Sequence, residues 1–352
     1  MKRKELILMK HDFLKSIDFN WNNELCEPVI ISYNRSAQLD KTLSAFYQIA
    51  HSGMRMHVLD NASTDNTEAL VKTWQSKWPN LIYHKNSYNI GGNANILRSL
   101  ELTQSEYSWT IGDDDAWYLE NLSLLITALA SRKADIIRLG WLVARDEQAE
   151  LISANQLIHK ESFFFSSVSM ISATIIRREL MTKALPYAYH NIANAYPQLA
   201  PILVALNSKD LVVYSLGKAL MVHQPSMLPG YHFGDLEWYM GWFAIAALLK
   251  SKQQQVVFRK EILRYMTKPQ KSMFHGFSFL LKVSINFKAF GVNQGKYLAK
   301  LFIMGEGLRL GIFVISLIYA LTPKFLAKTL QRIYYKSKGK SYPELKQDRS
   351  RI

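Results

Sequence analysis

Residues 28–140 alternate between short apolar runs and segments whose apolar residues recur at helical spacing. Each run has five to seven residues, a length typical of buried strands. The segments between them place apolar residues three and four apart, as in Leu39, Leu43 and Phe46. Such alternation favours right-handed βαβ units. The sequence therefore predicts an α/β fold with a mainly parallel central sheet, whose strands are 28–32, 56–60, 81–85, 107–112 and 134–140.

Polar side chains gather directly after the first four predicted strands. In a parallel sheet, ligands bind outside the carboxyl ends of the strands. We therefore expect a binding site at this edge of the sheet. The four polar clusters are residues 32–35, 60–63, 86–93 and 113–115.

Three consecutive aspartates, Asp113, Asp114 and Asp115, form the last of these clusters. In an extended segment Asp113 and Asp115 would face the same side, where a divalent cation could bridge them. Hard oxygen ligands favour Mg²⁺ or Mn²⁺, and an ion held by two carboxylates keeps coordination sites for diphosphate oxygens. The alternative interpretation of the triplet is a solvated turn or the N-terminal cap of the next helix.

Four motifs in these clusters carry a resemblance to a known family. They are PVIISYNRSAQLDKTL, VLDNASTDNT, NIGGNANILRSL and IGDDD, and they span about residues 27–130. In order and spacing they resemble the family 2 glycosyltransferases of the GT-A fold, of the bacterial surface-polysaccharide type. The resemblance implies transfer of a sugar from a nucleotide-diphosphate donor, with Mn²⁺ or Mg²⁺ as cofactor.

The resemblance also implies roles for single residues. Tyr33 would lie against the nucleobase, where stacking on an aromatic face is favourable. Gly91 and Gly92 would permit close backbone approach, with free N–H groups of the following helix near donor oxygens. The alternative interpretations are a core aromatic for Tyr33, a turn residue for Asn61 and a histidine bonded to a backbone carbonyl for His223. The implied donor-binding residues are Tyr33, Asn34, Arg35, Asp60, Asn61, Gly91, Gly92, Asp113 and Asp114, and the implied metal ligands are Asp113, Asp115 and His223.

The general base is the clearest departure from the family pattern. The family usually supplies it from an acidic pair some eighty residues after the metal motif, but residues 187–201, YAYHNIANAYPQLAP, contain no Asp or Glu. His190 is one substitute, because the ordinary pKa of histidine, near 6.5, suits the role. Asp235 and Glu237 are the others, and the sequence does not choose among the three.

The excess of basic over acidic residues is confined to the last third of the chain. Residues 250–352 hold 21 Lys and Arg against four Asp and Glu, whereas residues 1–249 hold 22 basic and 24 acidic residues. The longest uncharged apolar run there, 310–323, is shorter than the roughly 20 residues that span a bilayer. This composition predicts helices lying on an anionic membrane surface. The alternative is a helical subdomain with a solvated basic face. Nucleic acid is not an expected partner, since no binding motif accompanies the charge.

These patterns predict two domains. Residues 1–250 form the GT-A domain, with a nucleotide-sugar half at about 27–140 and an acceptor half at about 141–250, and residues 251–352 form a basic amphipathic helical region. The single cysteine, Cys26, excludes an internal disulfide. The first residues contain no apolar stretch suited to a secretory signal. We therefore expect a cytoplasmic protein, peripheral on the inner face of the cell membrane.

The predicted function is metal-dependent glycosyl transfer to a glycan or polyprenyl-diphosphate-linked acceptor in surface polysaccharide synthesis. A nucleotidyltransferase is one alternative, although SYNRSAQ lacks the glycines expected of its phosphate loop. A non-catalytic, membrane-associated scaffold with the same fold is the other. The sequence contains neither a P-loop nor a dinucleotide-binding glycine motif, so ATPase and dehydrogenase functions have no support.

Overall fold

The computed structural model describes residues 20–140, 148–194, 196–222, 236–265, 272–289, 291, 293–337 and 339, without the side chains of 236–239 and 265. The chain divides into two compact units, which are described separately. The domain boundary predicted at residue 250 falls inside the second unit. The first unit comprises residues 1–160, 167–190 and 198–226, and the second comprises 161–166, 191–197 and 227–352.

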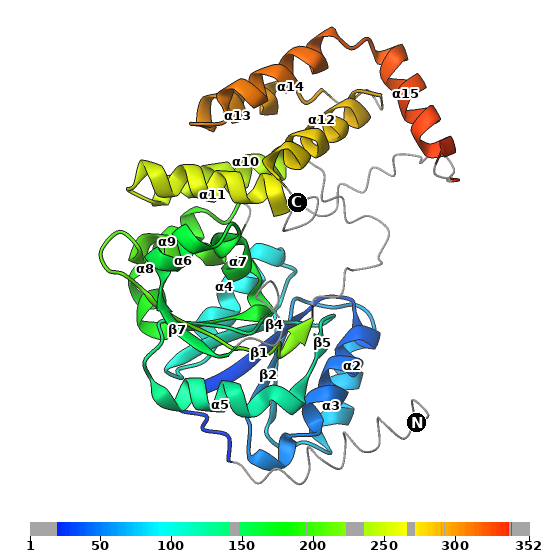
Figure 1. Cartoon of the computed structure of the whole chain (residues 1–352). Coiled ribbons are helices and arrows are strands. Elements are labelled where there is room, and N and C mark those ends of the chain that lie inside the picture. The colour runs from blue at the N-terminus through cyan, green and yellow to red at the C-terminus, as the bar shows by residue number, and fades with distance from the viewer. Residues whose placement is uncertain are drawn as a thin grey trace, which may run out of the picture. The chain divides into compact units, whose positions relative to one another are not determined.

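The first unit is built on an eight-stranded sheet with the order β3-β2-β1-β4-β8-β6-β9-β7 (Figure 1). The first four strands pair in parallel, and β6 pairs in parallel with β9. Only β7 and β8 among these eight strands run antiparallel to the strands they pair with. The sheet is therefore mainly parallel, as predicted. The strands are β1 (Cys26–Ser32), β2 (Met56–Asp60), β3 (Leu81–Lys85), β4 (Tyr107–Gly112), β6 (Ile136–Arg138), β7 (Glu150–Ser153), β8 (Thr174–Arg177) and β9 (Val212–Ser215), with β5 (Ala116–Trp117) and β10 (Met221–Val222) forming a separate pair.

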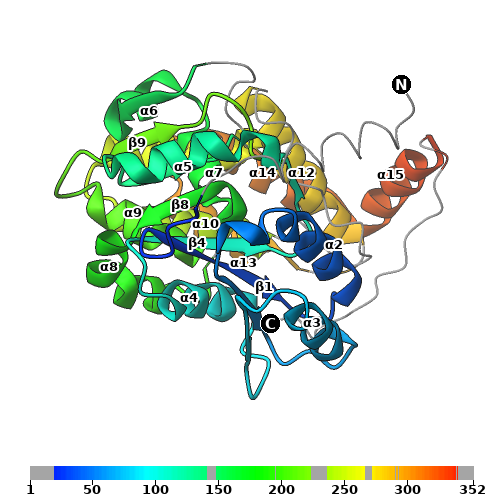
Figure 2. The same cartoon turned by 90° about the horizontal axis from the view of Figure 1, so that it is seen from below.

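Helices cover both faces of this sheet (Figures 1 and 2). Helices α2 (Ser36–Tyr47), α3 (Thr67–Gln75) and α5 (Leu122–Ser131) share the main apolar core with the strands. At its centre the Phe46 ring meets Trp109 and Trp117 edge to face, with centroids 6.0 and 4.8 Å away. Helices α4 (Gly92–Leu102) and α8 (Arg178–His190) contact each other on the opposite face. The remaining short helices are α6 (Ala154–Lys160), α7 (Phe164–Ser169), α9 (Ala200–Ala205) and the 3₁₀ turns η1 (Ala50–Ser52), η2 (Leu119–Asn121), η3 (Ile171–Ala173) and η4 (Pro197–Leu199).

The second unit is helical, which confirms the predicted helical C-terminal region. Its core includes Trp242 stacked on Phe258 with ring centroids 4.3 Å apart. A Cβ atom at Gly276 would lie 1.7 Å from the Leu263 carbonyl oxygen, so only glycine allows helices α11 and α12 to cross this closely. The helices are α10 (Leu236–Ile245), η5 (Ala246–Leu248), α11 (Lys252–Tyr265), α12 (Met273–Ala289), α13 (Gly295–Met304), α14 (Arg309–Leu321) and α15 (Lys324–Ser337).

Within the described part of the chain, no single helix has both the length and the apolar composition needed to span a membrane. Helices α14 and α15 meet the two criteria only as a pair, across a bend of 104°.

Candidate active site

Strand register brings all four polar clusters to the carboxyl edge of the sheet, where Asp60 also lies opposite Lys85 at the end of β3. In the parallel pair β1 and β2, Ser32 lies opposite Asp60. In the parallel pair β1 and β4, Ile31 lies opposite Gly112. The turns that follow these strands therefore start at neighbouring positions, as the alternating pattern predicted.

The aspartate triplet occupies a turn. Strand β4 ends at Gly112 and the next two residues form the turn, so the extended geometry expected for the triplet is wrong. The Ser32 hydroxyl donates a 2.7 Å hydrogen bond to Asp113 Oδ2. The Arg35 guanidinium Nη1 lies 3.2 Å from Asp113 Oδ1 and 2.8 Å from Asp114 Oδ2. The ends of β1 and β4 are thus joined by a hydroxyl and a cation.

The Asp113 carboxyl is only 3% exposed. The pKa of this carboxyl is raised to about 6, chiefly by burial and to a smaller extent by the neighbouring Asp114 charge. The Arg35 charge and the Ser32 hydrogen bond oppose this rise. Ionised Asp113 is consequently costly at this position unless positive charge stays close to it.

Two of the carboxylates also lie close to Gly112. A Cβ atom at Gly112 would lie 3.3 Å from Asp115 Oδ2 and 3.4 Å from Asp114 Oδ1, so the two oxygens flank the space that the missing side chain leaves. Hard oxygen donors of this kind fit Mg²⁺ or Mn²⁺.

A complete protein cage for a metal ion is not present among the described residues, which contain no group of three His, Cys, Asp or Glu side chains able to hold one. The predicted third ligand, His223, lies outside the described residues. Magnesium-type ions are commonly held by one or two carboxylates together with substrate phosphates. The aspartate turn fits an ion shared with a ligand.

Asn34 connects the first two turns. Its backbone has a φ of 52°, and its N–H donates to Ser63 Oγ at 2.9 Å. Its side-chain oxygen accepts from Thr64 N at 2.7 Å, while Ser36 N donates to Asp65 Oδ2 at 3.0 Å. The amide of Asn34 is therefore engaged in holding the turn after β1 against the turn after β2.

Asp60 is fully buried beneath these turns. Its Oδ1 accepts from Ser63 N at 2.8 Å and its Oδ2 accepts from the Tyr83 hydroxyl at 2.6 Å. Burial, and then the hydrogen bond to Asp60, raise the pKa of Tyr83. The two carboxylate oxygens thus join the turn after β2 to strand β3. The sequence patterns did not single out Tyr83, whose position on a strand resembles that of a core aromatic.

Asn61 is buried in a network of amide side chains. Its Oδ1 accepts from Asn86 Nδ2 at 2.9 Å and from Ile90 N at 3.0 Å, and its Nδ2 donates to Asn89 Oδ1 at 2.8 Å. Asn86 also donates to Asn95 Oδ1 at 2.9 Å. This network fixes the loop that leads into α4. The cluster of Asn residues after the third predicted strand was the available sequence signal for it.

Tyr33, Gly91 and Gly92 also lie at the carboxyl edge of the sheet, and all three are at least partly exposed. The Tyr33 side chain is 42% exposed, which excludes the core-aromatic interpretation. Gly91 caps the N-terminus of α4 with a φ of 85°, and Gly92 is the first residue of that helix. A Cβ atom at Gly92 would meet nothing within 4 Å. The ring and the helix start are available to a ligand.

Of the three candidate bases, only His190 has a described side chain. His190 is the last residue of α8 and its side chain is exposed. Glu237 lies in α10, but its side chain is not described, and Asp235 lies outside the described residues. The choice among them stays a prediction.

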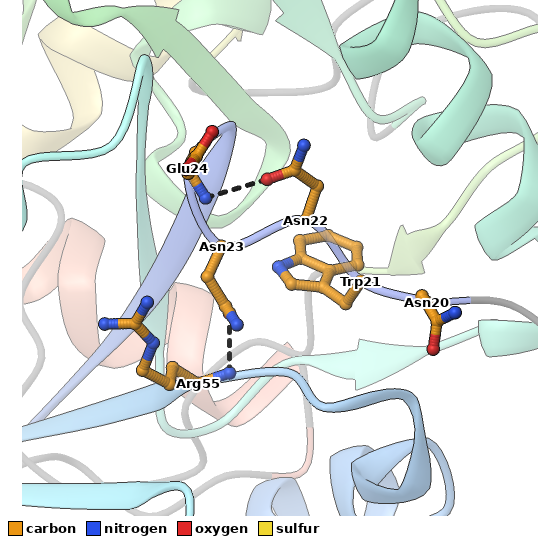
Figure 3. Close-up of a pocket in the computed structure, with 6 residues that line it drawn as sticks. All are labelled: Asn20, Trp21, Asn22, Asn23, Glu24 and Arg55. Atoms are coloured by element: carbon orange, nitrogen blue, oxygen red, sulfur yellow. Dashed lines mark hydrogen bonds between the residues drawn. The ribbon is translucent and has the colours of Figure 1, made fainter.

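A pocket of 590 Å³ lies at the opposite edge of the sheet, before β1 and β2 begin (Figure 3). There, Glu24 N donates to Asn22 Oδ1 at 2.9 Å and Arg55 N donates to Asn23 Oδ1 at 2.8 Å. Because parallel strands put their binding edge at the carboxyl ends, this pocket is separate from the aspartate turn. Its lining residues are Asn20, Trp21, Asn22, Asn23, Glu24 and Arg55.

Residues 29–193, which include nearly all of the four motifs, match the family described as Glycosyl transferase family 2. Residues 29–193 thus match the family that the motifs predicted, and the solved structures described below confirm the GT-A fold. The match supports a glycosyltransferase over the nucleotidyltransferase alternative.

Among curated relatives, the chain is 25% identical over 218 residues to abequosyltransferase RfbV of Salmonella typhimurium. That match covers 55% of this chain and 64% of the relative, which is less than two thirds of its length.

Two solved structures share the fold. TarS residues 1–349 of S. aureus, in complex with UDP-GlcNAc, aligns with a TM-score of 0.51 at 14% identity over 90% of this chain and 93% of TarS. The mannosyltransferase PcManGT of Pyrobaculum calidifontis, in complex with GDP-Man and Mn²⁺, gives 0.51 at 13% identity over 94% of each chain.

Proposed function

We propose that this protein transfers a sugar from a nucleotide-diphosphate sugar to a glycan or polyprenyl-diphosphate-linked acceptor in O-antigen, capsule or lipopolysaccharide synthesis. The observation that carries the proposal is the junction of β1 and β4, where Ser32 and Arg35 contact Asp113 and Asp114. It combines carboxylates and a cation at the edge where this class of sheet binds ligands. The abequosyltransferase relative supports the polysaccharide setting.

On the donor side, Tyr33 provides an exposed ring for stacking on the nucleobase. Asp60 and Asn61, both buried and hydrogen-bonded to neighbouring loops, hold the surface on which the base and ribose lie. Gly92 lets the donor approach the start of α4, and the N–H groups at a helix N-terminus favour anionic oxygens. These residues bind and orient the donor.

Asp113, Asp114 and Asp115 are the residues that would hold Mn²⁺ or Mg²⁺, with His223 as the predicted further ligand. When bound, such an ion stabilises the negative charge that develops on the departing nucleoside diphosphate. The Mn²⁺ in the PcManGT complex supports this part of the proposal. Arg35 keeps positive charge beside Asp113 and Asp114.

The acceptor hydroxyl must lose a proton as it attacks the sugar. We propose that the base is His190, Asp235 or Glu237, because residues 187–201 contain no acidic side chain. Separate His190→Ala, Asp235→Asn and Glu237→Gln variants identify it. The base variant loses turnover and one limb of its pH profile, yet keeps its thermal stabilisation by nucleoside diphosphate with Mn²⁺. If all three variants turn over normally, none of these residues is the base.

The acceptor class also suggests where the enzyme works. A polyprenyl-linked acceptor is confined to a membrane, and the net charge of +17 in residues 250–352 favours an anionic surface. We therefore place the protein, as part of the proposal, at the cytoplasmic face of the cell membrane. Vesicle binding tests this location independently of catalysis.

The first test measures the unfolding temperature of the full chain with Mn²⁺ and each of UDP, CDP, GDP and dTDP. A ligand that binds the native state raises this temperature. The matching nucleotide sugar should then release nucleoside diphosphate. Asp115→Asn should reduce turnover about 100-fold or more, the loss typical of removing one electrostatic contact to the transition state. Asp40→Asn is the control, since Asp40 lies on α2 and accepts a hydrogen bond from Trp74.

Two outcomes contradict the proposal. Wild-type turnover in Asp115→Asn removes the metal assignment. Failure of the wild-type chain to release nucleoside diphosphate from any nucleotide sugar, with Mn²⁺ and membrane extract present, favours the non-catalytic scaffold.

A further inference from the structure

Helix α14 has two apolar sides, and only one of them is packed against other described residues. Ile312, Ile315 and Tyr319 are buried against the rest of the second unit, where α14 contacts α12 and α13. The other side exposes large apolar residues at helical spacing, including Leu310 at 78% and Leu321 at 71% exposure. The full exposed stripe is Leu310, Phe313, Val314, Leu317, Ile318 and Leu321.

Helix α15 continues this exposure and adds charge. It packs on α12 through a buried side that includes Ala327 and Gln331. Its outer side exposes Phe325, Leu326, Leu330 and Ile333. Next to them, four exposed cations follow one another four residues apart, and these are Lys324, Lys328, Arg332 and Lys336.

We infer that these exposed residues of α14 and α15, here called the α14–α15 face, bind the surface of an anionic lipid bilayer. The apolar side chains enter the boundary between headgroups and acyl chains, and the cations contact lipid phosphates. The inference rests on the proposed location at an anionic membrane. It assigns that contact to one surface of the chain.

Charge favours lipid over other occupants of this face. Residues 309–337 carry five basic and no acidic side chains. A second copy of the chain, docked face to face, would bring two cationic stripes together in a contact with little water. An anionic bilayer instead accommodates apolar groups and phosphate-binding groups at the same time. An exposed apolar surface of this extent marks a contact site.

The test is cosedimentation of the full chain with phosphatidylcholine vesicles, prepared with and without phosphatidylglycerol. We expect binding to the phosphatidylglycerol vesicles, weakened by salt because the charges are exposed. The double variant Lys328→Glu with Lys336→Glu should bind about 30-fold more weakly or worse, since each surface cation contributes on the order of 1 kcal/mol. Leu317→Glu with Leu330→Glu should lose at least about tenfold through the apolar contribution.

The matched control is Lys133→Glu with Lys183→Glu, which makes the same charge change at exposed positions of the first unit and should bind like wild type. Wild-type binding by both α14–α15 variants overturns the inference. So does a wild-type dimer, seen by sedimentation velocity, that Leu317→Glu dissociates. Nucleoside diphosphate release measured without vesicles tests glycosyl transfer separately, so failure of one proposal is distinguishable from failure of the other.

Discussion

Arg35 donates a 2.8 Å hydrogen bond from its guanidinium to Asp114 Oδ2, so a cation from the turn after β1 contacts the carboxylates of the turn after β4. The same nitrogen lies 3.2 Å from Asp113 Oδ1. In the proposed function these carboxylates belong to the metal site. Arg35 therefore competes with the ion for the same oxygens.

Replacing Arg35 with Gln should strengthen Mn²⁺ binding by the isolated chain. Loss of a partly exposed ion pair of about 1 kcal/mol corresponds to about fivefold tighter binding of the competing cation. Calorimetric titration measures the affinity for Mn²⁺ in both proteins. Arg55→Gln is the control, because Arg55 pairs with Glu27 at the other edge of the sheet. Weaker Mn²⁺ binding in Arg35→Gln would show that the guanidinium supports the ion site instead.

Gly91 and Gly92 should respond differently to alanine. Gly91 has a φ of 85°, so Ala is strained there although open space surrounds it, and we expect a loss of about 1–2 kcal/mol in the free energy of unfolding. Gly92 is helical and equally open, so Gly92→Ala should keep or slightly raise stability. Urea denaturation measures both.

Gly92→Ala also tests the donor site. If nucleotide approaches the start of α4, the added methyl group weakens nucleoside diphosphate binding without lowering stability. Unchanged affinity in this variant would place the donor elsewhere.

Tyr83→Phe should destabilise the domain by about 1–3 kcal/mol, because it leaves the buried Asp60 Oδ2 without its donor. Chemical denaturation with the fluorescence of the core tryptophans as signal measures the loss. Tyr47→Phe is a matched control, since the exposed Tyr47 hydroxyl lies 3.5 Å from its acceptor, the Lys77 carbonyl oxygen. Equal stability of Tyr83→Phe and wild type would mean that water replaces the hydroxyl.

His57 and His84 should make the domain sensitive to acid. His57 contacts His84 and Glu27 at 3.0 Å each. Burial is the main cause that lowers the pKa of both rings. At His57, Glu27 opposes this lowering and the Arg55 charge adds to it. At His84, the His57 charge and then the Arg98 charge lower the pKa further. The unfolded chain then binds more protons below the ordinary histidine pKa, near 6.5, and stability falls as pH drops.

The slope is at most about 1.4 kcal/mol per pH unit for each ring. Unfolding temperatures measured between neutral and mildly acidic pH should therefore fall more steeply for wild type than for a His57→Gln, His84→Gln variant. Parallel curves for the two proteins would exclude these rings as the cause.

The first half of the fold was accessible from sequence because local signals agree there. The predicted strands 56–60, 81–85 and 107–112 coincide with β2, β3 and β4, since each apolar run ends in polar turn residues. The second half was less predictable. The loose alternation of apolar and polar residues in 162–180 favours a strand leading into a helix, but these residues form α7, a 3₁₀ turn and the short β8 before α8 begins. Strand β8 depends on pairing with β4 and β6, which lie far away in sequence.

The candidate site follows the same division. The types of residue at the strand ends were predicted, whereas their partners were not. Nothing local to Asp113 indicates that Ser32 and Arg35 contact it, because those residues are about eighty positions earlier. Likewise the buried Asp60 Oδ2 accepts its hydrogen bond from Tyr83, whose role appears only when β2 and β3 pair.

The hydrogen bonds of Asn34 to Ser63 and Thr64 have a practical meaning for engineering. Two loops tied in this way cannot be exchanged one at a time without leaving the remaining loop unsupported. A chimaera designed to accept a different nucleotide sugar would have to transplant residues 33–36 and 62–67 as a single cassette.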